Sequence, residues 1–303
     1  MRRFVALVVV FCLAFPAAAA ARPLLGVHGG VDRFEQLTGQ RSQVRHIFFG
    51  WGNTRFDQNF PAGGETPMIA MIPTTISPLA IARGSGDDYL FALNDWLARR
   101  GGVAYVRPMP EMNGHWNAYC AYTKSGRSKG DAYSTAAFRK AFARIAVLVR
   151  GGPAASVNAQ LARLKLPPVS RDLSALPTVR IVWNPQGYGS PDLPGNSAQA
   201  YYPGDRYVDV VANDLYYIRG KAAWAAAEQL YRAHPSKPYA FAEWGLWGID
   251  APSFVEQMAQ FVRTHRRVEL VAYYSGKRGS PWDLASKPRS RAAYKRLIVP
   301  LGN

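Results

Sequence analysis

Eight short apolar runs, separated by longer stretches with helical periodicity, constrain this 303-residue chain more than any other feature. The runs are rich in β-branched and aromatic residues, as buried strands are. They are Leu24 to Val27, His46 to Trp51, Met68 to Ile72, Val103 to Met109, Val179 to Trp183, Val208 to Leu215, Tyr239 to Ala242 and Leu270 to Tyr274. Strands that alternate with helices indicate a parallel sheet, and eight such repeats predict an α/β fold closed into a (β/α)8 TIM barrel.

The intervening stretches carry apolar residues at spacings of three and four, which predicts amphipathic helices. We expect these helices at Asp87 to Arg99, Thr135 to Val149, Lys221 to Ala233, Ser253 to Thr264 and Ser290 to Leu297. The longest connection, Gly151 to Pro177, is rich in Pro, Ala and Ser, and we expect a short helix around Asn158 to Leu164. No composition change marks a second domain.

The first 21 residues have the pattern of a signal peptide. Arg2 and Arg3 form a basic start, residues 4–15 are apolar, and the alanines at 17–21 suit signal-peptidase cleavage before Arg22. The apolar run is short for a membrane span and no comparable run follows, so we expect no stable membrane insertion. This pattern predicts a secreted or periplasmic protein whose residues 22–303 form the barrel, and we expect it to be monomeric.

The chain is strongly basic, with 37 Lys and Arg against 20 Asp and Glu, a formal net charge of +17. The basic residues are scattered, and no nucleic-acid-binding motif is present, so nucleic acid is not an expected partner. A generally cationic surface and attraction to an anionic polysaccharide both remain open. After cleavage only Cys120 remains, which excludes an internal disulfide.

Two glutamates occupy the places where a barrel of this kind carries its active site, the carboxyl ends of the strands. Of seven glutamates, only Glu111 and Glu243 follow strands, the fourth and the seventh. Strand alternation is expected to place Arg107, Met109 and Glu111 on one face. A charge at a buried strand end is costly unless it is paired or used, so the alternatives are salt bridges at the barrel rim and catalysis.

Tryptophans are concentrated near the same strand ends. Six of the eight lie at or just beyond a strand: Trp51, Trp116, Trp183, Trp244, Trp247 and Trp282. Because the flat C–H faces of sugar rings stack on aromatic side chains, this pattern favours a glycan cleft, with ordinary loop packing as the alternative. Two opposed carboxyl groups suit glycoside hydrolysis with retention. Arg107 and Tyr216 are expected to keep Glu243 ionised, while apolar neighbours raise the pKa of Glu111.

Five short motifs resemble glycoside hydrolase family 26, the β-mannanase family. They are Pro110-Glu111-Met112-Asn113-Gly114-His115-Trp116, Val182-Trp183-Asn184-Pro185, Tyr202-Pro203-Gly204-Asp205-Arg206-Tyr207-Val208-Asp209, Asp214-Leu215-Tyr216 and Phe241-Ala242-Glu243-Trp244-Gly245. They occur in the family's order between the fourth and seventh strands.

The resemblance implies that Glu111 is the acid/base and Glu243 the nucleophile, that Tyr216 holds the nucleophile, and that no cofactor is needed. It implies a β-glycan substrate, in most members β-1,4-mannan. The substrate-binding side chains expected around the two glutamates are Arg107, Asn113, His115, Trp116, Trp183, Tyr216, Trp244 and Tyr274.

Two departures from the family leave the substrate open. Pro110 stands where the family has His, and Tyr273-Tyr274-Ser275 stands where a Trp is expected. A non-catalytic carbohydrate-binding protein and a hydrolase of an anionic exopolysaccharide therefore remain as alternatives. The five histidines show no ligand spacing, so no metal site is expected. The basic loop at residues 275–279 either faces substrate or is a surface turn.

Overall fold

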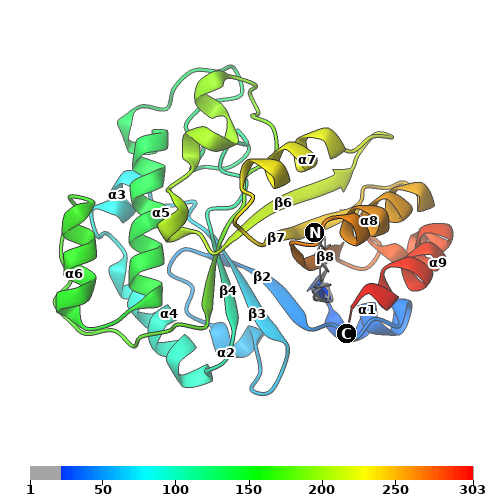
Figure 1. Ribbon diagram of the computed structural model, residues 1–303, viewed down its shortest axis with the longest axis horizontal. Coiled ribbons are helices and arrows are strands. Elements are labelled where there is room, and N and C mark those ends of the chain that lie inside the picture. The colour runs from blue at the N-terminus through cyan, green and yellow to red at the C-terminus, as the bar shows by residue number, and fades with distance from the viewer. Residues whose placement is uncertain (1–21, 303) are drawn as a thin grey trace, which may run out of the picture.

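A computed structural model describes residues 22–302, whose eight strands close into a parallel barrel (Figure 1). The strands follow one another around the barrel in chain order, and β8 pairs with β1. Their bounds are β1 Leu24–Gly29, β2 Val44–Gly50, β3 Thr66–Ile72, β4 Ala104–Pro108, β5 Val179–Trp183, β6 Val210–Tyr217, β7 Tyr239–Leu246 and β8 Val268–Gly276. The predicted (β/α)8 fold is confirmed, and each expected strand is present. The expected signal peptide lies outside the described residues.

Helices surround the barrel and connect successive strands, except β5 and β6, which are joined by a loop with short 3-10 turns (Figure 1). They are α1 Val31–Thr38, α2 Phe56–Asn59, α3 Pro78–Ala82, α4 Asp87–Arg100, α5 Thr135–Arg150, α6 Ala154–Arg163, α7 Trp224–Ala233, α8 Pro252–Thr264 and α9 Pro288–Leu297. The predicted helix from Lys221 was too long at its start, because residues 218–221 form a hairpin turn instead. Within residues 22–302, none of the helices combines the length and apolarity needed to cross a membrane.

Two apolar layers stabilise the barrel. The inner layer consists only of strand residues and fills the barrel interior: Val44, Met68, Tyr105, Val182, Val210, Ala212, Ala240, Ala242 and Leu270. The outer layer lies between the sheet and the helices, where Phe138, Phe142, Ile145 and Val149 form the buried stripe of α5. Because side chains alternate along a strand, each strand supplies both layers, and the barrel is packed and not a pore.

Candidate active site

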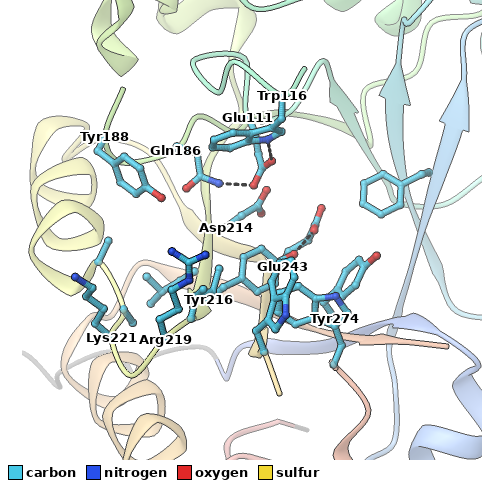
Figure 2. Close-up of a pocket in the computed structure, with 17 residues that line it drawn as sticks. Glu111, Trp116, Gln186, Tyr188, Asp214, Tyr216, Arg219, Lys221, Glu243 and Tyr274 are labelled. Atoms are coloured by element: carbon cyan, nitrogen blue, oxygen red, sulfur yellow. Dashed lines mark hydrogen bonds between the residues drawn. The ribbon is translucent and has the colours of Figure 1, made fainter. Parts of the chain in front are cut away.

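A cleft of about 680 Å³ opens at the carboxyl ends of the strands and contains both predicted catalytic glutamates (Figure 2). It is lined by Phe48, Glu111, Trp116, Gln186, Tyr188, Asp214, Leu215, Tyr216, Ile218, Arg219, Lys221, Ala222, Ala223, Glu243, Trp247, Tyr274 and Trp282. The structure thus brings Glu111 and Glu243 together from opposite sides of the barrel, in the region where barrel enzymes place their reactive groups.

Exposed aromatic rings lie on this cleft. Of the five large apolar side chains that are exposed within residues 22–302, four line it: Trp116, Tyr188, Ile218 and Trp247. Trp116 and Trp247 are each 49% exposed. Large exposed apolar groups usually mark binding surfaces, so the cleft is suited to a ligand with apolar faces.

A β-bulge in β7 aims Glu243 into the cleft. Ala242 belongs to the inner layer and Trp244 to the outer layer, and the pairing with β6 skips a residue so that Asp214 lies opposite Glu243. With regular alternation the residue after Ala242 would face outward, but the extra residue of a bulge re-aims the side chain. The strand does not end in the carboxylate, as the sequence suggested, because it continues to Leu246.

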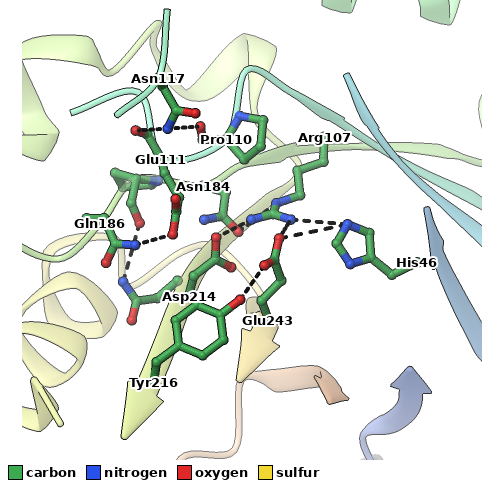
Figure 3. A network of polar contacts seen from close by, with 12 residues as sticks. His46, Arg107, Pro110, Glu111, Asn117, Asn184, Gln186, Asp214, Tyr216 and Glu243 are labelled. Carbon is green, nitrogen blue, oxygen red and sulfur yellow. Dashed lines mark hydrogen bonds and ion pairs between the residues drawn. The ribbon is translucent and has the colours of Figure 1, made fainter. Parts of the chain in front are cut away.

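Arg107 on β4 fixes the Glu243 carboxylate from below the cleft (Figure 3). Its Nη1 donates to Glu243 Oε1, its Nη2 donates to Asp214 Oδ2, and its Nε donates to Asn184 Oδ1 at 3.0 Å. The guanidinium is fully buried. Burial alone would lower the pKa of Arg107, but the adjacent Asp214 and Glu243 carboxylates raise it, so its charge is retained.

Tyr216 completes the surroundings of Glu243. The phenol, on β6, donates to Glu243 Oε2, so both carboxylate oxygens accept hydrogen bonds. Burial and the Glu243 charge raise the pKa of Tyr216 well above its ordinary value, which keeps the phenol protonated as a donor. The guanidinium and the phenol together fix the position of the Glu243 carboxylate in the cleft.

Glu111 is positioned by a loop and not by its strand. β4 ends at Pro108, and both Met109 and Glu111 adopt left-handed backbone, with φ of 48° and 52°. Such a conformation is uncommon for residues other than glycine, and it persists where surrounding contacts enforce it. Here the Glu111 amide donates to Asn184 O at 2.7 Å, and Tyr119 Oη donates to Pro110 O at 2.7 Å.

The two oxygens of Glu111 face polar donors on the cleft wall. Trp116 Nε1 donates to Oε2 at 2.7 Å, and Gln186 Nε2 donates to Oε1. Burial raises the pKa of Glu111, the nearby Glu243 charge raises it further, and the two donors partly oppose this shift. One cleft therefore contains a carboxyl group biased toward its protonated form and a second carboxyl group held in place by a guanidinium and a phenol, an arrangement suited to combined acid and nucleophilic catalysis.

Two histidines lie beside this pair in an uncharged state. Burial lowers the pKa of His46 well below its ordinary value, and Arg107 lowers it further. His46 Nε2 lies 3.2 Å from Arg107 Nη1 and therefore accepts, which places the ring proton on Nδ1. Burial also lowers the pKa of His28, whose ring stacks on Tyr274 with centroids 4.6 Å apart. Both rings thus contribute shape and hydrogen bonds without charge.

Six of the eight predicted binding residues lie in or around the cleft. Trp116, Tyr216 and Tyr274 line the cleft. Arg107 and Asn113 are fully buried and support it, Asn113 by donating to Gln186 O at 2.9 Å and Tyr188 O at 3.0 Å. His115 lies at the rim, where Nδ1 is 3.1 Å from Ser190 Oγ, outside the residues that line the cleft.

Trp183 and Trp244 were wrongly expected to contact substrate, because both are 0% exposed. Trp183 packs against Tyr202 and His234 in the outer layer, and Trp244 stacks on Tyr294. Strand alternation explains both, since each follows a residue that faces the barrel interior or the cleft. Met109 was likewise wrongly grouped with Arg107, because the strand ends before it and its side chain packs in the outer layer.

Several cleft residues lie on loops whose path the sequence did not reveal. They are Gln186, Tyr188, Ile218, Arg219 and Lys221. Trp282, in the loop after β8, packs on Tyr216 at 4.5 Å and Tyr274 at 5.3 Å between ring centroids. It provides a cleft tryptophan beyond the eighth strand, whereas the family resemblance led us to look for one near the end of that strand, at Tyr273-Tyr274-Ser275. Within the sequence, Trp282 could have been recognised as a cleft residue only because it is one of the tryptophans that follow strands.

Comparison with known proteins finds glycan hydrolases. No family model matches the chain. Endoglucanase H of Acetivibrio thermocellus is 23% identical over 291 residues, an alignment that covers 88% of this chain and only 29% of the relative. This chain therefore spans less than a third of that protein.

Solved structures with the same fold are mannanases. A Bacillus subtilis mannanase matches with a TM-score of 0.59 and 17% identity, over 92% of this chain and 86% of that chain. A GH26 β-mannanase of Bacteroides ovatus matches with a TM-score of 0.59 and 15% identity, over 92% of this chain and 88% of that chain. A Cellulomonas fimi endo-β-1,4-mannanase variant matches with a TM-score of 0.60 and 16% identity, over 90% of this chain and 71% of that chain. At these identities the likeness establishes the barrel fold.

Proposed function

We propose that this chain is a retaining β-glycoside hydrolase related to glycoside hydrolase family 26. The observation that carries the proposal is the pair of carboxyl groups in one aromatic cleft, Glu111 with a raised pKa and Glu243 held by Arg107 and Tyr216. A non-catalytic binding protein would need the aromatic rings but not this pair of opposite environments.

The pair supports a two-step reaction in which each group has one role per step. Glu243 attacks the anomeric carbon as the glycosidic C–O bond breaks, and Glu111 transfers its proton to the departing oxygen. Glu111, now ionised, takes a proton from a water that attacks the anomeric carbon, and the Glu243 carboxylate departs. The Glu243 charge raises the pKa of Glu111, so its neutralisation in the first step lowers that pKa and suits Glu111 to the second step as a base.

The cleft and the relatives together support a proposal for the backbone of the substrate. Aromatic rings on both sides of the carboxyl groups suit a chain that extends in both directions, which supports endo action (Figure 2). The relatives are named as mannanases and an endoglucanase, which supports β-1,4-mannan or a related β-glycan as the backbone. The predicted signal peptide supports action outside the cytoplasm, by a protein that we take to be a monomer.

The test is reducing-end release from galactomannan, glucomannan, mixed-linkage glucan, xylans and acidic exopolysaccharides. Glu243→Ala should abolish activity on every polymer that the wild-type protein cleaves. Glu256→Ala, which removes a glutamate from the outer helix α8, is the matched control and should leave the activity intact. NMR of the first product released should show the β-anomer.

Three results would contradict the proposal. Activity that persists in Glu243→Ala would exclude Glu243 as nucleophile, and an initial α-anomer would exclude retention. A folded protein that binds one of the glycans but cleaves none would favour the non-catalytic binding protein.

A further inference from the structure

We propose that the cleft selects β-glycans that carry acidic substituents, and that Arg219 and Lys221 bind the acidic group. This inference rests on the proposed function and narrows its substrate class. The two cations project from the turn between β6 and α7 and line the same cleft as Glu111 and Glu243 (Figure 2). Figure 2 shows the Arg219 guanidinium directed into the cleft on the left of the view, below Tyr188, with the Lys221 side chain farther from the two glutamates.

A rigid two-residue hairpin presents these cations. Ile218 and Lys221 exchange backbone hydrogen bonds of 2.9 and 3.2 Å, with Arg219 and Gly220 at the tip. Both tip residues have positive φ, 51° and 82°, as a type I′ turn requires. The first central position of such a turn is usually Asn or Gly. Arg219 occupies it here, in a backbone conformation that is unfavourable for arginine. Its side chain is placed at the cleft by a fixed turn and not by a loose loop.

Neither cation has a carboxylate partner within residues 22–302, although other exposed arginines do. Arg171 pairs with Asp95 at 2.9 Å, and Arg232 pairs with Glu228 at 2.5 Å. None of the three cleft carboxyl groups pairs with Arg219: Asp214 and Glu243 accept from the buried Arg107, and Glu111 accepts from Trp116 and Gln186. Two exposed cations beside a ligand-sized cleft are thus available to an anion that arrives with the ligand.

The surroundings define what kind of anion would fit. The turn is flanked by the apolar Ile218, Ala222 and Ala223, and the rings of Trp247 and Trp282 lie on the same cleft. A sugar ring stacked on these aromatics would direct a substituent toward the turn. A guanidinium and an ammonium together bind a carboxylate or a sulfate ester through charge-assisted hydrogen bonds. The net charge of +17 would favour the approach of such a polyanion at low salt.

The experiment compares one backbone with and without acid groups. The substrates are konjac glucomannan, the same polymer oxidised at C6 to uronic acid, and the same polymer carrying sulfate esters. The variants are Arg219→Gln with Lys221→Gln, and a control with the same charge change, Arg266→Gln with Lys295→Gln. Arg266 precedes β8, so it lies at the end of the barrel opposite the cleft, and Lys295 lies on the outer helix α9; both are exposed.

We expect the wild-type protein to show a kcat/KM on at least one acidic polymer roughly tenfold or more above that on untreated glucomannan, the size expected of one charge-assisted contact. The Arg219/Lys221 variant should lose that preference, measured as the ratio of its kcat/KM on the acidic polymer to its kcat/KM on the untreated polymer. The control should keep the preference. The acidic polymer that is preferred identifies the group as carboxylate or sulfate.

A wild-type protein without preference, or a variant that retains it, would overturn the inference while leaving the glycosidase intact. If no polymer is cleaved, the proposed function fails, and affinity electrophoresis in gels containing each polymer decides the inference separately. Stronger retardation by an acidic polymer, lost in the Arg219/Lys221 variant alone, would support the cationic subsite. Equal retardation of all three proteins would refute it.

Discussion

Arg107 and Glu243 meet across the floor of the cleft, where the guanidinium of a β4 residue donates to the carboxylate of a β7 residue. The same guanidinium also holds Asp214, so one cation contacts two buried carboxyl groups. Arg107→Lys replaces a planar fork with a single ammonium that cannot keep all these contacts. We expect kcat to fall on the order of 100-fold, as when a preorganised donor to a reacting group is removed. The free energy of unfolding, measured by urea denaturation, should fall by about 3 kcal/mol.

Arg144→Lys is the matched control for Arg107→Lys. Arg144 is also fully buried and also pairs with a carboxylate, Asp87, but it lies on α5 in the helix layer. The Arg144→Lys variant should have a lower free energy of unfolding, while the kcat of its folded molecules should be unchanged. Equal losses of activity in both variants would mean that Arg107 acts only through folding.

Trp116→Phe should move the alkaline limb of the pH–activity profile to higher pH. The indole donates to Glu111 and thereby favours the ionised carboxylate, which lowers the pKa of Glu111. Phenylalanine keeps an aromatic surface but has no donor, so the pKa of Glu111 rises and its proton is retained to higher pH. The profile of kcat/KM measures this shift. Trp247→Phe, in the same cleft but without a bond to Glu111, should leave the limb in place.

Glu111→Gln should stabilise the protein at neutral pH while abolishing activity. Because burial raises the pKa of Glu111, the native state keeps this proton at pH values where the unfolded chain has lost it. Stability therefore falls as the pH rises from the unfolded pKa through the folded one. Because glutamine does not ionise, the variant does not lose this stability. Its free energy of unfolding at neutral pH should exceed that of the wild-type protein by on the order of 1 kcal/mol.

Thermal unfolding at two pH values measures the effect. The gain should vanish near about pH 4, where the unfolded carboxyl is itself largely protonated. Glu256→Gln, an exposed site on α8, should show no gain at either pH. A variant less stable than the wild-type protein at neutral pH would contradict the argument.

Tyr216→Phe should lower kcat roughly tenfold, because Glu243 loses one of the two donors that hold its carboxylate. Tyr274→Phe is the control, since its phenol lines the same cleft without a hydrogen bond to another described residue. Comparable losses in both variants would assign the effect of Tyr216 to the cleft surface and not to Glu243.

Trp183→Phe should affect folding and not binding. Its ring is enclosed in the outer layer, so truncation leaves a cavity and should cost about 1–3 kcal/mol in denaturant unfolding. The KM of the folded enzyme should be unchanged. An increase in KM without loss of stability would restore the original expectation that this side chain contacts substrate.

The sequence predicted the barrel because its strands and helices repeat with unmistakable periods, and it predicted Glu111 and Glu243 because few acidic residues follow strands. It misjudged Trp183 and Trp244 because proximity to a strand end was weighed above strand alternation, which places both on the outer face. It could not place Gln186, Arg219 or Trp282, because their positions depend on loop conformations set by tertiary contacts. The β7 bulge that aims Glu243 also has no signature in the sequence.

The loops after β4 and β5 are joined to each other by several hydrogen bonds. His115 N donates to Ser190 O at 2.7 Å, Ser190 N donates to Asn113 O at 2.9 Å, and the Asn113 side chain bonds the backbone around Gln186. Glu243, by contrast, belongs to a strand ladder. Exchange of the β5 loop for one from a relative would therefore displace the acid/base, whereas the nucleophile would stay in place. Changes of specificity by grafting should succeed only when both loops are transplanted as one unit.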